Sequence, residues 1–194
     1  MSDLPRTNFF PCKRWLSATA WIFTVVFCCA ALSPAVPSAA GEFQPGRDLT
    51  KLPPPVQRMR QAILQACASG GIEKLRLPID MNEIPPVFGK GNERDPIAYF
   101  KAVSADGQGR EILAILYNIL TTGYAVLNPG TKDEMFVWPY HAAIPPASLT
   151  PSQEVELYRF VSPARYKEMV AGGKYNFYSA GITPDGVWHY FTPG

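Results

Sequence analysis

The chain has 194 residues, of which 47% are apolar and 18% charged, and its formal net charge is +2 at pH 7. This length suits one domain with a sizeable core. So small a basic excess argues against nucleic-acid binding, which needs a basic surface to neutralise phosphates. The only two histidines, His141 and His189, lie in no metal-binding pattern, so we expect no metal and no cofactor.

Residues 1–40 have the features of an export signal. Lys13 and Arg14 precede an apolar run at 15–32, and the small residues of 33–40 suit a signal peptidase. We therefore predict a signal peptide that is cleaved near Ala40–Gly41 and a periplasmic or secreted protein. The alternative is an inner-membrane anchor formed by residues 15–32, since this run would reach about 27 Å as a helix. The prolines that follow the run favour cleavage because they break a helix.

The predicted mature chain has balanced charge and a single cysteine. Three of the 18 basic residues and one of the 16 acidic residues precede Gly41, which leaves equal numbers of each sign. Removal of the signal leaves Cys67 alone, so no intramolecular disulfide is expected. Cys67 shares a helical face with Val56, Met59 and Ile63, and this spacing favours a buried structural thiol over a catalytic one.

After a flexible linker at 41–52, the pattern predicts one globular domain at 53–194. Its first helix runs over 54–69 and ends at a pair of glycines. The stretch 75–79 alternates like a short strand, while Pro78, Pro85 and Pro86 interrupt any long element. We therefore predict a short strand or extended segment that is followed by a loop.

Further helices are predicted where a capping residue is followed by proline. Asp95 and Pro96 begin a short helix that ends near Val103. A strongly apolar helix over 110–121 is predicted as the central core helix. Two short helices follow, one from Thr150 to about 161 and one over 162–170.

Two pairs of β-like runs predict antiparallel hairpins. The first pairs 124–127 with 134–140, and the second pairs 175–182 with 187–191 across a Thr-Pro-Asp-Gly turn. Mixed helices and hairpins, without βαβ alternation, indicate an α+β fold. We expect a single small domain with helices packed on a small antiparallel sheet of two hairpins. The pattern leaves open whether both hairpins belong to one sheet.

Two aromatic blocks are the candidate ligand-binding residues. Strand alternation predicts Trp138 and Tyr140 on one face, with His141 beside them, and Trp188 and Tyr190 together on another. If the hairpins are neighbours, these rings form a platform for a sugar or peptide. The alternative is that they fill the core, which the need of each strand to bury one face favours. The candidates are Trp138, Tyr140, His141, Trp188, His189 and Tyr190.

No catalytic motif is present in the sequence, so we expect a protein that is not an enzyme. The competing hypothesis is a hydrolase of cell-wall glycan or peptide, with a histidine and a loop carboxylate as acid and base. It requires His141 or His189 within hydrogen-bond reach of a carboxylate. The loop carboxylates are Glu83, Glu93 and Asp95.

Three blocks, Glu134–Tyr140, Leu149–Tyr158 and Gly186–Phe191, carry a resemblance to an uncharacterised group of exported alphaproteobacterial proteins, a domain of unknown function. The resemblance covers roughly residues 95–191. It implies an envelope address and a single small domain, and no activity. The expected function is therefore a non-enzymatic envelope binding or interaction domain, whose partner is an envelope component or another protein. A membrane is expected as a partner only if the N-terminal segment stays uncleaved.

Overall fold

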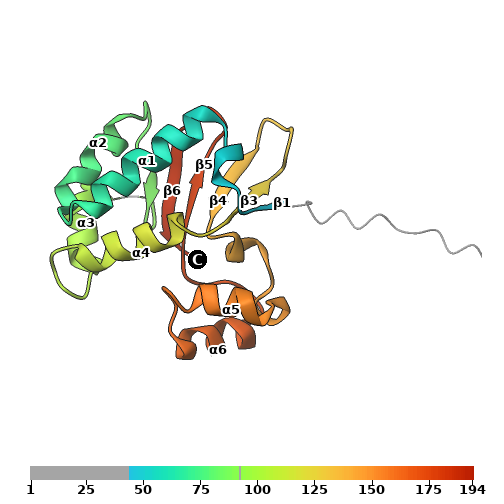
Figure 1. The fold of residues 1–194 in the computed structure, drawn as a ribbon. Helices are drawn as coiled ribbons and strands as arrows, with labels where there is room; N and C mark the ends of the chain where they lie inside the picture. Colours follow the sequence, from blue (N-terminus) through green and yellow to red (C-terminus); the bar gives the residue numbers. More distant parts are fainter. Residues whose placement is uncertain (1–43, 92) are drawn as a thin grey trace, which may run out of the picture. The chain divides into compact units, whose positions relative to one another are not determined.

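The structure is a computed structural model that describes residues 44–91 and 93–194 (Figure 1). These residues belong to one compact unit. The predicted signal peptide and the alternative anchor lie outside the described residues. Within the described ranges, no helix is both long and apolar enough to cross a lipid bilayer.

A six-stranded sheet is the centre of the fold, with the strand order β1-β3-β4-β5-β6-β2. Both predicted hairpins form, and β4 pairs with β5, so they share one sheet. The α+β class is confirmed, but the sheet is not limited to two antiparallel hairpins, because β1 extends one edge and β2 pairs in parallel with β6. The strands are β1 (Gln44–Gly46), β2 (Val87–Phe88), β3 (Tyr124–Leu127), β4 (Met135–Trp138), β5 (Tyr178–Ile182) and β6 (Trp188–Pro193).

Six α-helices accompany the sheet in the described part of the chain. In Figure 1, α1 and α4 cross one face of the sheet, while α5 and α6 pack together at one end of it. The strongly apolar α4 contacts both α1 and β5, as expected of a central core helix. The helices are α1 (Pro54–Ala68), α2 (Arg76–Asp80), α3 (Pro96–Val103), α4 (Arg110–Leu120), α5 (Pro151–Leu157) and α6 (Pro163–Gly172).

The strand predicted at 75–79 is wrong. Residues Ile72–Leu75 form the 3-10 helix η2, and α2 follows it directly. Pro78 is tolerated there because it lies in the first turn of α2, where backbone N–H groups have no partner within the helix. Ile72, Leu75 and Ile79 are buried while Leu77 is 70% exposed, which is the spacing of a helix face.

Local capping fixes the starts of three helices where the sequence predicts them. The carboxylate of Asp95 accepts the N–H of Ile97 at the start of α3. The Ser162 hydroxyl accepts the N–H of Arg165 at the start of α6. At α5, Thr150 and Gln153 form a reciprocal capping box, which satisfies two backbone donors at once.

We expect the substitution Thr150→Ala to lower the free energy of unfolding by about 1 kcal/mol, because it removes the hydroxyl half of this capping box. The measurement is urea denaturation at pH 7. Ser152→Ala is the matched control, since Ser152 is exposed and is the second residue of the same helix. Equal losses in the two variants would contradict the capping role of Thr150.

Part of the predicted flexible linker is ordered. Within 41–52, residues 44–46 form β1, residues 49–51 form the 3-10 helix η1, and Leu52 is 3% exposed. Gly46 pairs with Tyr124 of β3, and a Cβ at Gly46 would lie 2.3 Å from the Tyr124 ring. The absence of a side chain at Gly46 therefore lets the Tyr124 ring pack against the backbone of β1.

A β-bulge in β6 overturns the predicted faces of the second aromatic block. Ile182 pairs with Trp188 and Gly181 with Tyr190, so His189 is the extra residue. Trp188 packs in the core against Phe88, with ring centroids 5.4 Å apart. The Tyr190 ring instead lies across Gly181, where a Cβ would be 2.3 Å from the ring. Trp188 and Tyr190 therefore do not share a face.

Candidate functional site

The six residues predicted to bind a ligand separate into different environments. Trp138 and Trp188 are fully buried, and Trp138 packs against Tyr124 with ring centroids 5.6 Å apart. Tyr140 and His141 are buried in a polar cluster, Tyr190 is half-buried, and only His189 is exposed. The six do not form one exposed aromatic platform. Most of their surface fills the core.

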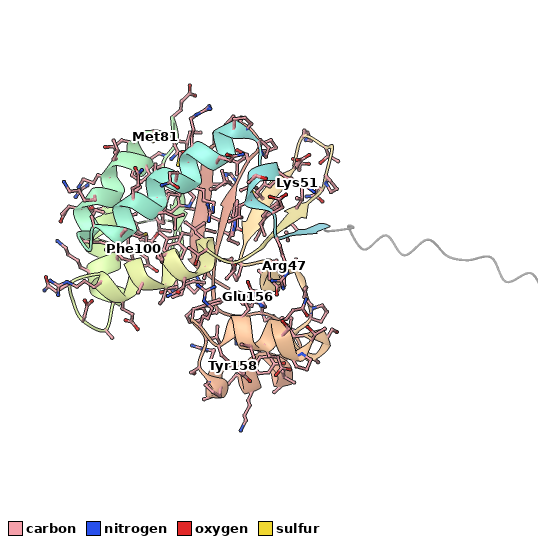
Figure 2. All side chains as sticks on the ribbon, in the orientation of Figure 1. Arg47, Lys51, Met81, Phe100, Glu156 and Tyr158 are labelled. Carbon is pink, nitrogen blue, oxygen red and sulfur yellow. The ribbon has the colours of Figure 1, made fainter. Side chains whose placement is uncertain are left out.

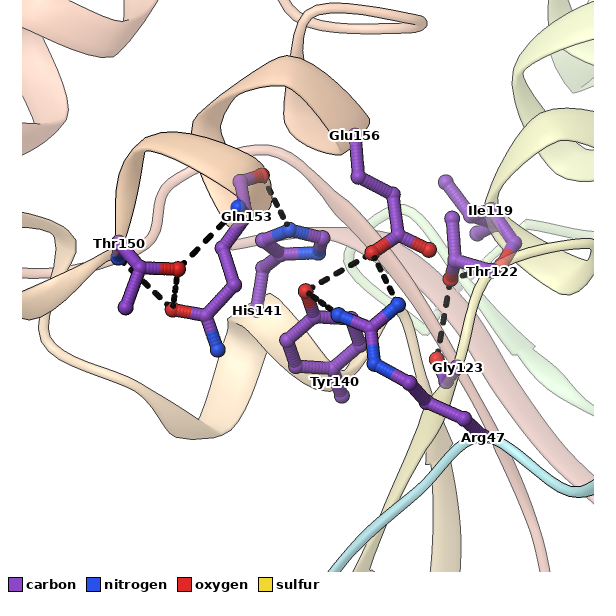
Figure 3. A network of polar contacts seen from close by, with 9 residues as sticks. All are labelled: Arg47, Ile119, Thr122, Gly123, Tyr140, His141, Thr150, Gln153 and Glu156. Atoms are coloured by element: carbon purple, nitrogen blue, oxygen red, sulfur yellow. Dashed lines mark hydrogen bonds and ion pairs between the residues drawn. The ribbon is translucent and has the colours of Figure 1, made fainter.

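The polar cluster consists of Arg47, Tyr140, His141, Gln153 and Glu156 (Figure 3). It joins the residue that follows β1 to the 3-10 helix η3 (Tyr140–Ala143) and to α5. The Tyr140 hydroxyl donates to Oε2 of Glu156 at 2.8 Å and accepts from Nη2 of Arg47 at 2.9 Å. Nη1 of Arg47 lies 3.1 Å from the same Glu156 oxygen. Burial, and then the bond to Glu156, raise the pKa of Tyr140 to about 12. The phenol therefore stays protonated and donates.

His141 is the most unusual member of this cluster. Its ring stacks on Tyr140 at 4.1 Å between centroids, and its Nε2 lies 3.0 Å from the Gln153 carbonyl oxygen. A carbonyl only accepts, so Nε2 carries the proton and Nδ1 is the unprotonated nitrogen. Nδ1 is buried with no hydrogen-bond partner among the described residues. Burial lowers the pKa of His141, so the ring is neutral near pH 7.

This cluster attaches a small lobe to the sheet. Helices α5 and α6 enclose their own core of Leu157, Val161 and Met169. In Figure 2, Arg47 reaches from the β1 side of the molecule toward Glu156 on α5. The side chains of Arg47, Tyr140 and Glu156 bond to one another, and His141 bonds to the Gln153 backbone carbonyl, so the cluster has a structural role.

The geometry that the hydrolase hypothesis requires is not found in the described residues. No hydrogen bond or ion pair there joins either histidine to a carboxylate. Asp95 caps α3 and pairs with Arg76 at 3.3 Å, and Glu93 accepts the Lys90 N–H at 2.9 Å. Glu83 is exposed.

A cleft beside the β5–β6 turn contains two of the predicted residues, Trp188 and His189. It has a volume of about 490 Å³ and lies where residues 84–87, the turn 183–187 and the β3–β4 loop meet. Most of the side chains that line the cleft are apolar, and three are ionisable, namely Lys132, Asp185 and His189. The lining residues are Ile84, Pro85, Val87, Lys132, Thr183, Pro184, Asp185, Val187, Trp188 and His189.

Two of the apolar side chains that line the cleft are unusually exposed. Ile84 is 78% exposed and Val87 is 44% exposed. Trp188 also lines the cleft but is fully buried. Its backbone N–H donates to Oδ1 of Asn82 at 2.8 Å and its indole N–H donates to the Tyr190 carbonyl at 3.0 Å. Exposed apolar side chains at a concave site are typical of a binding surface.

The polar groups of the cleft differ in how they are partnered. The Thr183 hydroxyl donates to Asp185. Lys132 is exposed, and none of the ion pairs in the described chain includes it. The bulge in β6 turns His189 outward between the buried Trp188 and the half-buried Tyr190. The cleft thus presents one unpaired cation and one exposed imidazole.

Sequence reasoning missed Ile84, Val87, Lys132 and Asp185 as cleft residues. One signal in the sequence was available, because Ile84 and Val87 flank two prolines in a segment that has no helical or strand period. Lys132 had no such signal, since its approach to the cleft depends on the pairing of β4 with β5.

Cys67 is buried within α1, as predicted, and burial raises its pKa to about 12. Such a thiol stays protonated at neutral pH, which favours the structural role over a nucleophilic one. Within the described ranges, no group of three or more metal-ligating His, Cys, Asp or Glu side chains occurs.

Comparison of this chain with protein-family models, with curated proteins and with solved structures found no match.

Proposed function

We propose that the protein is a non-enzymatic binding domain of the bacterial cell envelope, and that its recognition site is the cleft beside the β5–β6 turn. The observation that carries this proposal is the exposure of Ile84 and Val87 on the wall of a cleft of about 490 Å³. The envelope address follows from the export signal that the sequence predicts at residues 1–40.

Exposed apolar area of this kind has a free-energy cost in the unbound protein. Each Å² of apolar surface removed from water contributes about 25 cal/mol, so covering one isoleucine side chain yields ~1.5–3 kcal/mol. A partner that covers Ile84 and Val87 recovers this energy. The volume lies within the range of ligand sites, roughly 300–1,000 Å³, and the polar groups at the rim supply orientation.

The substitution Ile84→Asp tests the cleft directly. The full chain is immobilised, mildly solubilised envelope extract is passed over it, and retained mass is measured. We expect Ile84→Asp to lower the retained mass at least tenfold, because a carboxylate replaces the exposed apolar wall. The carboxylate also stays solvated in the free protein, so the fold is preserved.

Leu77→Asp is the matched control, because Leu77 is 70% exposed and does not line the cleft. We expect this variant to retain as much as the unsubstituted chain. Equal retention by Ile84→Asp and the unsubstituted chain would overturn the proposed site. An equal loss of retained mass in both variants would mean that binding depends on exposed apolar side chains in general and not on the cleft.

A further inference from the structure

The outer side of α1 has a hollow that is separate from the cleft beside the β5–β6 turn. Its volume is about 430 Å³, and no residue lines both the hollow and the cleft. All but one of its lining residues belong to α1, and most of them carry an amide or a guanidinium group. The polar lining residues are Gln57, Arg58, Arg60, Gln61 and Gln65.

The spacing of these residues places the two arginines on either side of a row of amides. An α-helix has about 3.6 residues per turn, so residues four apart lie close together on one face. Gln57, Gln61 and Gln65 form such a row. Around the helix axis, Arg58 is about 60° to one side of Gln61 and Arg60 about 100° to the other side. A ligand along the row therefore has a guanidinium on each side of it.

The lining of the hollow carries positive charge without a carboxylate. The 15 residues of α1 include no Asp or Glu, and none of the ion pairs in the described chain includes Arg58 or Arg60. Leu49 also lines the hollow, but the adjacent Asp48 does not, and Asp48 pairs with Lys51 at 3.9 Å. The lining thus contains two cations and no anion.

The guanidinium of Arg60 is held in place and is only partly satisfied. Arg60 is half-buried, and its Nε donates at 2.9 Å to the carbonyl oxygen of Leu120, the last residue of α4. Its Nη groups have no hydrogen-bond partner among the described residues. Burial lowers the pKa of Arg60, which means that the surroundings disfavour its charge. An anionic group next to these N–H donors would offset that cost.

The exposed polar side chains indicate what the anionic group is attached to. Arg58, Gln61 and Gln65 are exposed, and their side chains form no hydrogen bond or ion pair with other described residues. A carboxamide both donates and accepts, as a hydroxyl group does, whereas a guanidinium only donates and pairs best with a carboxylate or phosphate. The lining therefore matches a ligand with many hydroxyl groups and repeated negative charges, which is the chemistry of an acidic polysaccharide.

Two other kinds of ligand fit the hollow less well. Helices that lie on a membrane surface present large apolar side chains to it, and none of the exposed large apolar side chains of the described chain belongs to α1. Neutral small molecules are bound mainly by apolar and aromatic linings, and no aromatic residue lines this hollow. Both comparisons favour a charged, hydroxyl-rich ligand.

We propose that the outer face of α1 binds an acidic polysaccharide, with its negative groups at Arg58 and Arg60 and its hydroxyl groups along the row of glutamines. This is a second binding site, and it does not depend on the cleft of the proposed function. Charge-assisted hydrogen bonds are about twice as strong as neutral ones, so the negative groups of the polysaccharide contribute most to its affinity.

The test uses a short oligogalacturonate, in which each sugar carries one carboxylate, and the same oligosaccharide as its methyl ester. Both carry a fluorescent label, and binding to the full chain is measured by fluorescence anisotropy. We expect the acidic form to bind at least tenfold more tightly than the ester, because esterification removes the negative charges and keeps the hydroxyl groups.

Substitutions on α1 locate the site. Arg58→Gln should weaken binding of the acidic form at least fivefold, and glutamine keeps the helix because its helix propensity is close to that of arginine. Arg94→Gln is the matched control, since Arg94 is exposed and does not line the hollow, and we expect a change of less than twofold. Gln61→Ala should weaken binding about threefold, whereas Gln108→Ala, at an exposed glutamine outside the hollow, should not.

Three results would overturn the proposal: no binding of the acidic form, equal affinity for the two forms, or equal binding by Arg58→Gln and the unsubstituted chain. Displacement of the oligosaccharide by poly-glutamate at a similar concentration of carboxylates would show a general polyanion surface. Displacement by vesicles of anionic phospholipid would indicate a membrane surface. Either displacement would also overturn the assignment to a polysaccharide. Because the hollow and the cleft share no lining residue, envelope retention by Ile84→Asp tests the proposed function separately.

Discussion

Trp188→Ala is expected to lower the free energy of unfolding by about 3–5 kcal/mol, the usual cost of truncating a large buried aromatic side chain. Trp188 is fully buried, and its ring contacts Phe88, which in turn packs edge-on against Phe100 of α3 at 4.9 Å. Its indole N–H also donates to the Tyr190 carbonyl at 3.0 Å, so truncation leaves a cavity and removes that bond. Against a typical total of ~5–15 kcal/mol, this loss is large.

The measurement for Trp188 is urea denaturation followed by far-ultraviolet circular dichroism, since the variant loses a fluorophore. His189→Ala is the matched control, because His189 is the next residue along β6 and is exposed. We expect it to change the free energy of unfolding by no more than about 0.5 kcal/mol. A loss for Trp188→Ala as small as that of His189→Ala would show that the indole does not hold β6 against the helices.

Local sequence signals predict the α-helices of the described chain other than α2. The Asp95 and Thr150 caps, each followed by proline, begin α3 and α5 where expected, because a capping side chain bonds to backbone donors only two or three residues away. The same holds for the apolar period of α4. These elements follow from interactions within a few residues.

Features that depend on the folded chain could not be predicted in this way. Alternation placed Trp188 and Tyr190 on one face, but the bulge at His189 arises from the pairing of β6 with β5. Pro78 predicts an interruption of any long element, yet it fits in the first turn of the short helix α2. The strands β1 and β2 are too short to carry a period, and they form because β3 and β6 offer free edges.

The polar cluster also could not be predicted from the sequence. Arg47 meets Tyr140 93 residues further along the chain, and no local pattern connects them. The aromatic residues around them make Tyr140 and His141 candidates for ligand binding in the sequence. In the structure, Tyr140 bonds to Arg47 and Glu156, and His141 bonds to Gln153 (Figure 3). The sequence therefore indicates two residues of the cluster but not the hydrogen bonds that they form.

The burial of neutral His141 makes the stability of the protein sensitive to mild acid. Its pKa is lowered mainly by burial, and Arg47 also lowers it, while the Gln153 carbonyl and Glu156 act in the opposite direction. The unfolded chain, with a histidine pKa of 6.5, therefore binds more protons than the folded chain as the pH falls below that value. The stability that neutral His141 contributes is fully present above pH 6.5. It is lost as the pH falls from there through the pKa of His141 in the folded state.

We expect the free energy of unfolding to fall by up to about 1.4 kcal/mol per pH unit between pH 6.5 and 5.5, above the usual range of carboxylate titration. Urea denaturation at several pH values measures this slope. His141→Gln should flatten it, because the amide does not titrate. The matched control is the same substitution at the exposed His189. The variants are compared by the slope of stability against pH and not by absolute stability, because His141→Gln also loses the stacking on Tyr140. An unchanged slope in His141→Gln would mean that protonation of this buried ring does not control the acid sensitivity of the fold.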